Sequence, residues 1–217
     1  MCFSAIVSFT AAAGLSLLGI ATIRRTTSTR AFLLAAFPCL FALQQTLEGF
    51  VWLGNSHRYF SSIETITIYG FLLFASLLWL VLSPLAIYYL EQDLNRRKFL
   101  LGLTIGGLLL GIYLFGWIIY HGVSPQTFSG NLLYDLSFIP YYEISKYLYL
   151  AVIVLPFSLA HSSKLKIFGG LVTVSFILSQ IFFQVTMVSV WCFFAAVLSG
   201  GLYFVIGDLD VDRVTIG

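Results

Sequence analysis

Seven runs of about 20 apolar residues follow one another along the chain, and this feature most constrains its fold. The runs do not alternate between apolar and polar residues, as the strands of a membrane barrel do. Only 9% of the 217 residues are charged, against about 25% in soluble domains, so the chain has no adequate polar coat for water. Because a segment that crosses lipid must satisfy its own backbone groups, the sequence predicts an all-α polytopic membrane protein.

A single transmembrane domain is expected to occupy the whole chain, residues 1–217. The expected spans are residues 3–23, 31–53, 65–90, 99–120, 143–160, 167–185 and 188–206. Pro38 predicts a kink in the second span, because proline cannot donate a backbone hydrogen bond. The apolar loop over residues 121–142 is expected to lie at the membrane surface, with a short helix near residues 131–138.

Glycines recur along the fourth expected span at a spacing that favours close helix packing. The pairs Gly102–Gly106 and Gly107–Gly111 each place two small residues one turn apart. We therefore expect this span to approach a neighbouring helix closely through its glycines.

Basic residues are distributed unequally between the two sides of the predicted bundle. One side carries Arg24, Arg25, Arg30, Arg96, Arg97, Lys98, Lys164, Lys166 and Arg213. The other side carries Arg58 and Lys146, and Lys146 is expected to pair with Glu143 one turn before it. Since lysine and arginine accumulate on the cytoplasmic side of membrane proteins, the sequence predicts an outer N-terminus and a cytoplasmic C-terminus.

One acidic residue, Glu48, lies within the second expected span. An ionised carboxylate inside a bilayer costs at least a few kcal/mol, so its presence points to a function or to a local partner. Gln44 and Gln45 lie one turn before it and Trp52 one turn after it, on a face expected to point into the bundle. We expect these four residues, with Trp191 of the last span, to bind a ligand. The alternative is that neighbouring donors satisfy Glu48 and lock the bundle.

Two cysteines, Cys2 and Cys192, are expected near the outer ends of the first and last spans. They could form a disulfide on an oxidising face. They could instead supply two thiolates of a metal site completed by Glu48 or by a histidine, with His121 as the candidate. The cofactor would then be zinc or another soft transition-metal ion. In a third interpretation they remain unpaired apolar residues.

Three segments together resemble an uncharacterised bacterial family of multi-pass membrane proteins. They are the opening residues Met1 to Ala5, the segment from Gln44 to Trp52, and the segment from Ser189 to Ala196. The resemblance covers essentially the whole chain. It implies a cell-membrane protein of the bacterial inner membrane, and it implies no activity.

The sequence favours a binding protein that holds a metal ion, a lipid headgroup or a small amphiphile in an outer-half polar pocket around Glu48. One alternative is an intramembrane metal-dependent lipid hydrolase, similar in span number and orientation to alkaline ceramidases but without their HxxxH pair. Another is a small-solute transporter with a three-plus-one-plus-three helix organisation. Whether the protein is an enzyme, and its oligomeric state, are left open. A net charge of +2 and the absence of a basic cluster argue against nucleic acid as a partner.

Overall fold

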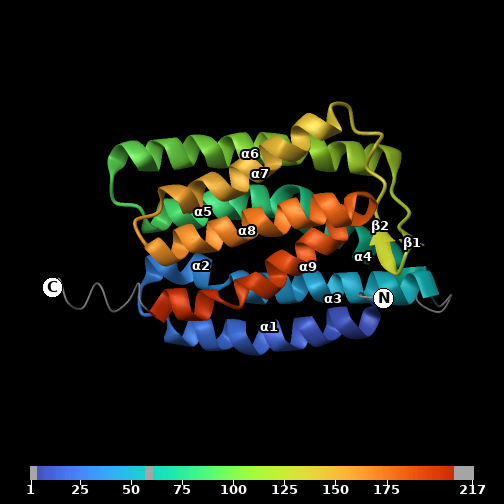
Figure 1. Ribbon diagram of the computed structural model, residues 1–217, viewed down its shortest axis with the longest axis horizontal. Helices are drawn as coiled ribbons and strands as arrows, with labels where there is room; N and C mark the ends of the chain where they lie inside the picture. The colour runs from blue at the N-terminus through green and yellow to red at the C-terminus, as the bar shows by residue number, and fades with distance from the viewer. Residues whose placement is uncertain (1–3, 57–60, 208–217) are drawn as a thin grey trace.

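The computed structural model describes residues 4–56 and 61–207 of the chain. Its elements are α1 (Ala5–Arg25), α2 (Phe32–Ala35), α3 (Phe37–Ser56), α4 (Ser61–Leu73), α5 (Trp79–Leu90), α6 (Leu94–His121), β1 (Gln126–Phe128), β2 (Asn131–Leu133), α7 (Tyr142–Leu159), α8 (Ser163–Phe182) and α9 (Met187–Ser199). They form seven helical stretches that are long and apolar enough to cross a membrane (Figure 1). The predicted polytopic helical fold with seven spans is therefore confirmed.

The second and third spans are built from more than one helix. A 3-10 turn at Thr29–Ala31 and α2 precede α3, and the helix is interrupted at Ala36, two residues before Pro38. The expected kink is thus present. In the third span a π-helical segment, Phe74–Leu78, joins α4 to α5. These irregular turns lie within the bundle, where neighbouring helices can satisfy their backbone groups.

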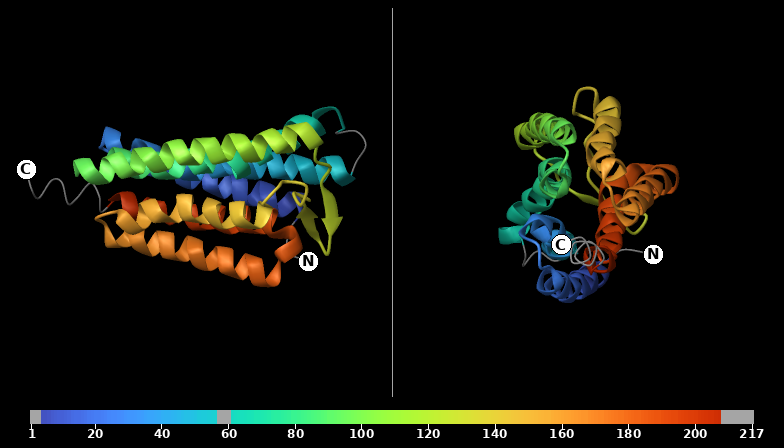
Figure 2. Two further views of the ribbon diagram at one scale, coloured as in Figure 1. Left: turned by 90° about the horizontal axis from the view of Figure 1, so that it is seen from above. Right: turned by 90° about the vertical axis from the view of Figure 1, so that its left-hand side faces the viewer.

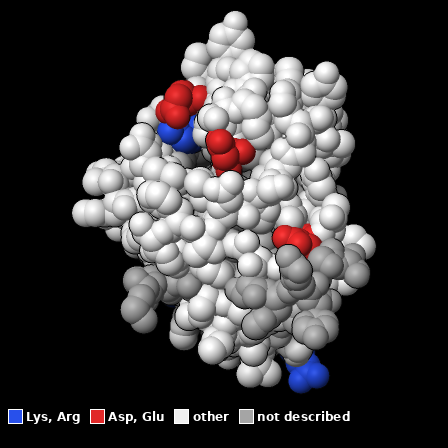
Figure 3. Space-filling model, turned by 90° about the vertical axis from the view of Figure 1, so that its right-hand side faces the viewer, with Lys and Arg blue, Asp and Glu red and all other residues white. Residues whose placement is uncertain are grey.

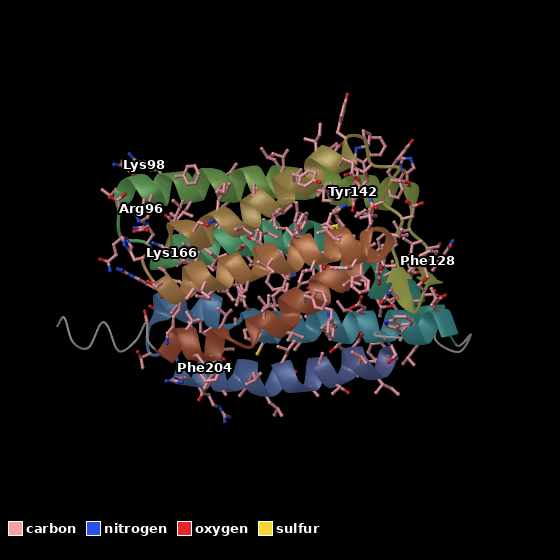
Figure 4. All side chains as sticks on the ribbon, viewed as in Figure 1. Arg96, Lys98, Phe128, Tyr142, Lys166 and Phe204 are labelled. Carbon is pink, nitrogen blue, oxygen red and sulfur yellow. The ribbon has the colours of Figure 1, made fainter. Side chains whose placement is uncertain are left out.

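The two ends of the bundle differ in charge and in structure (Figure 4). Arg96, Lys98 and Lys166 lie at one end, which we call the basic end. The β1–β2 hairpin lies at the opposite end, which we call the hairpin end. Which end faces the cytoplasm stays a prediction from the charge distribution.

The spans differ in how much of their surface they bury. The second, third and seventh are the most buried, whereas α1 and α6 are peripheral. Viewed end on, α1 and α6 lie on different edges of the helix group (Figure 2). In sequence-distant contacts, α3 packs on α9 and α5 packs on α7. The interior of the bundle is therefore built around α3, α5 and α9, and the site described below lies among these helices.

The hairpin corrects one expectation about the long loop. Instead of a short helix near residues 131–138, β1 and β2 pair in an antiparallel register with Phe128 opposite Asn131. The two residues between them, Ser129 and Gly130, have φ angles of 48° and 77°. A two-residue turn with positive φ matches the right-handed twist of a hairpin, and glycine adopts it readily. The Ser-Gly pair was the signal for this turn. Leu132 is fully buried, so the hairpin packs onto this end of the bundle.

One of the two expected glycine pairs carries close helix packing. Gly107 of α6 faces α5, and an added Cβ at Gly107 would overlap the carbonyl oxygen of Leu80. Pro84 of α5 has no N–H to give to that carbonyl, so the carbonyl is turned toward the glycine. Gly111 lies against Leu77 of the π-helical segment, whereas a Cβ added at Gly102 or Gly106 would meet nothing within 4 Å. The packing of α6 on the third span therefore depends on Gly107 and Gly111.

We predict that Gly107→Val lowers the free energy of unfolding by about 1–3 kcal/mol, because the new side chain must push α6 away from α5. Gly106→Val on the adjacent residue is the matched control, since nothing lies within 4 Å of it. Thermal unfolding of the purified protein in detergent measures both. Equal losses of stability in the two variants would show that close packing at Gly107 is not the cause.

Candidate functional site

Glu48 lies at the centre of a buried hydrogen-bonded network between α3 and α9. Glu48 is 2% exposed. The Ser189 hydroxyl donates to Oε1 of Glu48 at 2.5 Å, and the Gln45 amide donates to Oε2 at 3.2 Å. Among residues 4–56 and 61–207, no lysine, arginine or histidine forms an ion pair with it. The acid is therefore held by neutral donors, and it joins two helices that are distant in the sequence.

A second hydrogen bond extends this network to the third span. The indole N–H of Trp79 donates to Oε1 of Gln44 at 2.7 Å. The Trp79 ring stacks on Phe41 with ring centroids 3.9 Å apart. The side chain of Gln44 also interacts with the Cys192 thiol. One turn of α3 thus contacts α5 through Gln44 and α9 through Glu48.

Tyr134 brings the segment after the hairpin close to this network. It is buried, and its ring stacks on Phe71 at 5.0 Å. Burial raises the pKa of Tyr134 well above its ordinary value, and the nearby Glu48 and Cys192 raise that pKa further. Its hydroxyl has no hydrogen-bond partner among the described residues. Tyr134 is therefore a neutral phenol whose hydroxyl group can still donate a hydrogen bond.

The face predicted from the sequence does point into the bundle. Gln45, Glu48 and Trp52 are all buried, as is Gln44. These residues do not line the cavities described next, although Trp191 and Cys192 do. The polar network therefore lies directly behind a cavity wall, and its predicted contact with a ligand stays a prediction.

Three neighbouring cavities, each sharing lining residues with the next, lie beside this network. The first, which we call the vestibule, is open at the hairpin end and has a volume of about 540 Å³. Its polar lining includes Asp135, Glu143 and Lys146, and its apolar lining comes from the segment after β2 and the start of α9. A volume of this size is typical of small-molecule sites.

The second and third cavities lie beyond the vestibule, toward the basic end. The inner cavity, of about 60 Å³, shares Tyr142 and Lys146 with the vestibule. The deep cavity, of about 40 Å³, shares Tyr149, Trp191 and Cys192 with the inner cavity. Its lining is otherwise apolar and aromatic except for Ser83, which donates to the Ile153 carbonyl. Each space can hold a few small groups in this conformation.

Aromatic packing holds the wall that the inner and deep cavities share. The Trp191 ring meets Tyr149 edge to face at 5.5 Å and Phe176 at 5.1 Å. The indole N–H of Trp191 is buried and has no hydrogen-bond partner within the described part of the chain. An occupant of either cavity would therefore contact Trp191.

The residues proposed for a metal site are not shown together. Within the described residues, no group of three or more His, Cys, Asp and Glu side chains is placed to hold a metal ion. Cys2 lies outside the described residues, so its pairing with Cys192 stays untested. His121 lies at the end of α6, where its ring stacks on Phe138 at 4.7 Å. The metal site remains a prediction from the sequence.

A separate polar cluster fixes the basic end. The Glu91 carboxylate accepts the backbone N–H groups of Gln92 and Asp93 at 2.8 and 2.9 Å. His161 Nε2 lies 3.2 Å from the same oxygen. Burial opposes the charged form of Glu91, but these two backbone donors and His161 outweigh burial and lower its pKa. The cluster therefore ties the loop after α5 to the loop after α7.

Sequence reasoning found the Glu143–Lys146 pair, whose Nζ to Oε2 distance is 2.7 Å, but missed its place beside a cavity. It also missed Tyr134 and Tyr149. Tyr142, Ser145 and Tyr149 recur at helical spacing along one face of α7, and the inner cavity has all three in its lining. This run of hydroxyl groups was the available signal, although tyrosines are also common at membrane interfaces.

Comparison with known proteins supports the resemblance noted in the sequence. Residues 1–213 match the model of DUF6629, which is described as a family of unknown function. No curated protein and no solved structure matches the chain. The expectation of an uncharacterised family is therefore confirmed, while a bacterial origin stays a prediction.

We predict that Glu48→Gln retains stability whereas Glu48→Leu loses about 1–3 kcal/mol. A glutamine can still accept from Ser189, and it can donate to Oε1 of Gln45, which has no partner among the described residues. Leucine would leave the Ser189 hydroxyl and the Gln45 amide buried without an acceptor. Thermal unfolding of the two variants checks this. Equal stability of both would show that the hydrogen bonds do not hold α3 to α9.

A second prediction concerns the pH dependence of stability at the basic end. Because the pKa of Glu91 is lowered in the folded protein, its carboxylate contributes stability that is complete above the ordinary glutamate pKa of about 4.3. That contribution is lost as the pH falls below this value. We expect Glu91→Gln to lower the melting temperature at neutral pH. We also expect the melting temperature of this variant to fall less on acidification than that of the unmodified protein. An acid-side decline in melting temperature that is the same in Glu91→Gln and the unmodified protein would contradict this assignment.

Proposed function

We propose that this chain, which belongs to DUF6629, a family of unknown function, binds a small amphiphile within the membrane. The polar part of this ligand occupies the vestibule beside Lys146. Its apolar part enters the inner cavity and extends toward the deep cavity, against Trp191 and Cys192. In the orientation predicted from the sequence, the vestibule opens on the outer side of the membrane.

The observation that carries this proposal is the change in lining along the three cavities. Charged side chains occur in the vestibule, Lys146 and several hydroxyl groups lie among mostly apolar side chains in the inner cavity, and aromatic and aliphatic groups dominate the deep cavity. This order matches a molecule with one polar and one apolar end. Along α7 the lining runs from Tyr142 to Phe157, which at 1.5 Å per residue is about 22 Å. That length exceeds half of the roughly 30 Å hydrocarbon core.

Energetics favour the same direction of entry. The apolar groups of the deep cavity form no hydrogen bonds with a polar head. A head group placed there would lose its hydrogen bonds to water. An apolar chain, in contrast, gains about 25 cal/mol for each Å² that it removes from water. The polar head therefore stays in the vestibule, and only the chain passes Lys146.

The other functions considered from the sequence gain no specific support. Ser189 donates to Glu48 and does not line the three cavities, so this pair is not exposed to a lipid bond. A transport path would have to continue past the deep cavity to the basic end. Hydrolysis and transport therefore stay alternatives, and ligand binding is the function that the cavities support best.

We predict that stearate brominated along its chain quenches the fluorescence of Trp191 in a saturable manner. The bromine atoms would lie in the inner or deep cavity, beside the indole ring. Comparison of the protein with Trp191→Phe isolates this component. Trp117 lines a separate hollow on the outer surface of α6, so Trp117→Phe controls for quencher that has simply dissolved in the detergent or lipid.

A cavity-filling variant tests where the probe binds. Ser145 lines the inner cavity, and Ser145→Leu should weaken saturable quenching by about tenfold or more, because the new side chain occupies the space of the ligand. Ser158→Leu makes the same change on the exposed face of α7 and should have no effect. Quenching that does not saturate, or that is equal in these two variants, would refute binding in the inner cavity.

A further inference from the structure

We propose that the head of the bound amphiphile is zwitterionic, with an anionic phosphate beside Lys146 and an ammonium group at the rim formed by Asp135 and Glu143. The ligand class is a single-chain zwitterionic phospholipid. This inference rests on the proposed binding of an amphiphile and specifies the chemistry of its head.

The rim of the vestibule is acidic. Asp135 and Glu143 both line the vestibule, both are exposed, and neither lines the inner cavity. In the view onto the hairpin end, a basic group lies recessed beside a hollow between acidic groups (Figure 3). An incoming head group therefore meets negative charge first, which favours an ammonium group at the rim.

Lys146 lies deeper than the two acids. Its side chain is 8% exposed, against 70% for Glu143, and it lines both the vestibule and the inner cavity. The structure gives its ammonium group one hydrogen bond, to Glu143, among the described residues. An ammonium group carries three donors, so Lys146 can also bind an anion that reaches the neck between the two cavities.

Tyr134 offers a further donor close to the vestibule. It lines the vestibule, it is 3% exposed, and its hydroxyl is buried and has no partner within the described residues. A buried hydroxyl without a partner costs about 1–3 kcal/mol, so an acceptor that reached it through a small movement of the Tyr134 side chain would be stabilising. A phosphate offers several such acceptor oxygens, and an ammonium head offers none.

The order of charges therefore selects among head groups. From the surface inward, the lining presents two carboxylates, then one ammonium group, then apolar cavities. A zwitterionic phospholipid carries its ammonium outermost, its phosphate next and its chain last, so each group meets its complement. An anionic head without an ammonium leaves the two carboxylates at the rim without a partner, and a cationic head without a phosphate leaves Lys146 without one, so either should bind more weakly than a zwitterionic head.

The test is competition against brominated stearate at Trp191 by three amphiphiles of matched chain length. They are lysophosphatidylcholine, which is zwitterionic, lysophosphatidylglycerol, which is anionic, and an alkyltrimethylammonium, which is cationic. We expect lysophosphatidylcholine to compete about fivefold better than either of the others. Lys146→Met should weaken the two phosphate-bearing competitors by about tenfold and leave the alkyltrimethylammonium unweakened.

Asp135→Asn tests the rim separately, on an exposed loop where the substitution should not disturb folding. It should reduce the preference for lysophosphatidylcholine over lysophosphatidylglycerol to about twofold or less. Glu64→Gln removes an acid that does not line the vestibule, and it should leave the preference unchanged. Thermal unfolding of each variant confirms that it is folded.

The outcomes separate the two proposals. If brominated stearate does not quench Trp191 saturably, amphiphile binding itself is refuted. If the probe binds but the three competitors are equal, or the anionic or cationic one is preferred, the zwitterionic head is refuted while amphiphile binding stands. A preference for lysophosphatidylcholine that survives Asp135→Asn unchanged would also overturn the assignment of the rim.

Discussion

The bond between Ser189 and Glu48 is the interaction on which the rest of this bundle depends, because it joins helices 141 positions apart in the sequence. Without water, a carboxylate inside a membrane must be satisfied by the protein itself. Glu48 meets this requirement with two neutral donors, and Gln44 on the same turn fixes Trp79 of the third span. Three spans are thereby held in one register. Apolar side chains alone would not fix that register, because lipid solvates them equally well.

The cavities follow from this arrangement. Cys192 lies one turn after Ser189 on α9, and Trp191 lies beside it, so the hydrogen bond that anchors Ser189 also positions the wall of the inner and deep cavities. Trp79, held by Gln44, lines the deep cavity from the opposite side. Glu48 thus contributes to the site without lining it. Its role in this structure is to position the helices whose side chains line the cavities.

The two ends of the protein are stabilised by different means. At the basic end, Glu91 ties two loops together with backbone donors and His161. At the hairpin end, β1 and β2 cover the bundle, and Asn55 donates to Thr127 at 2.7 Å. The vestibule opens beside this hairpin, between the segment that follows β2 and the starts of α7 and α9. The opening therefore lies at the end that is covered by loops and a small hairpin. The opposite end is held by the charged cluster around Glu91.

The sequence by itself determined the seven helices, the kink at Pro38, the inward face of Glu48 and the pairing of Glu143 with Lys146. Each of these depends on local composition or on helical periodicity, which one segment carries alone. Only the tertiary structure decided that the hairpin replaces a surface helix, that Gly107 rather than Gly106 meets α5, and that Trp191 faces a cavity which Glu48 does not line. These features depend on which helices become neighbours and at what register. Long-range contacts, such as the one between Ser189 and Glu48, set that choice, and no local pattern encodes them.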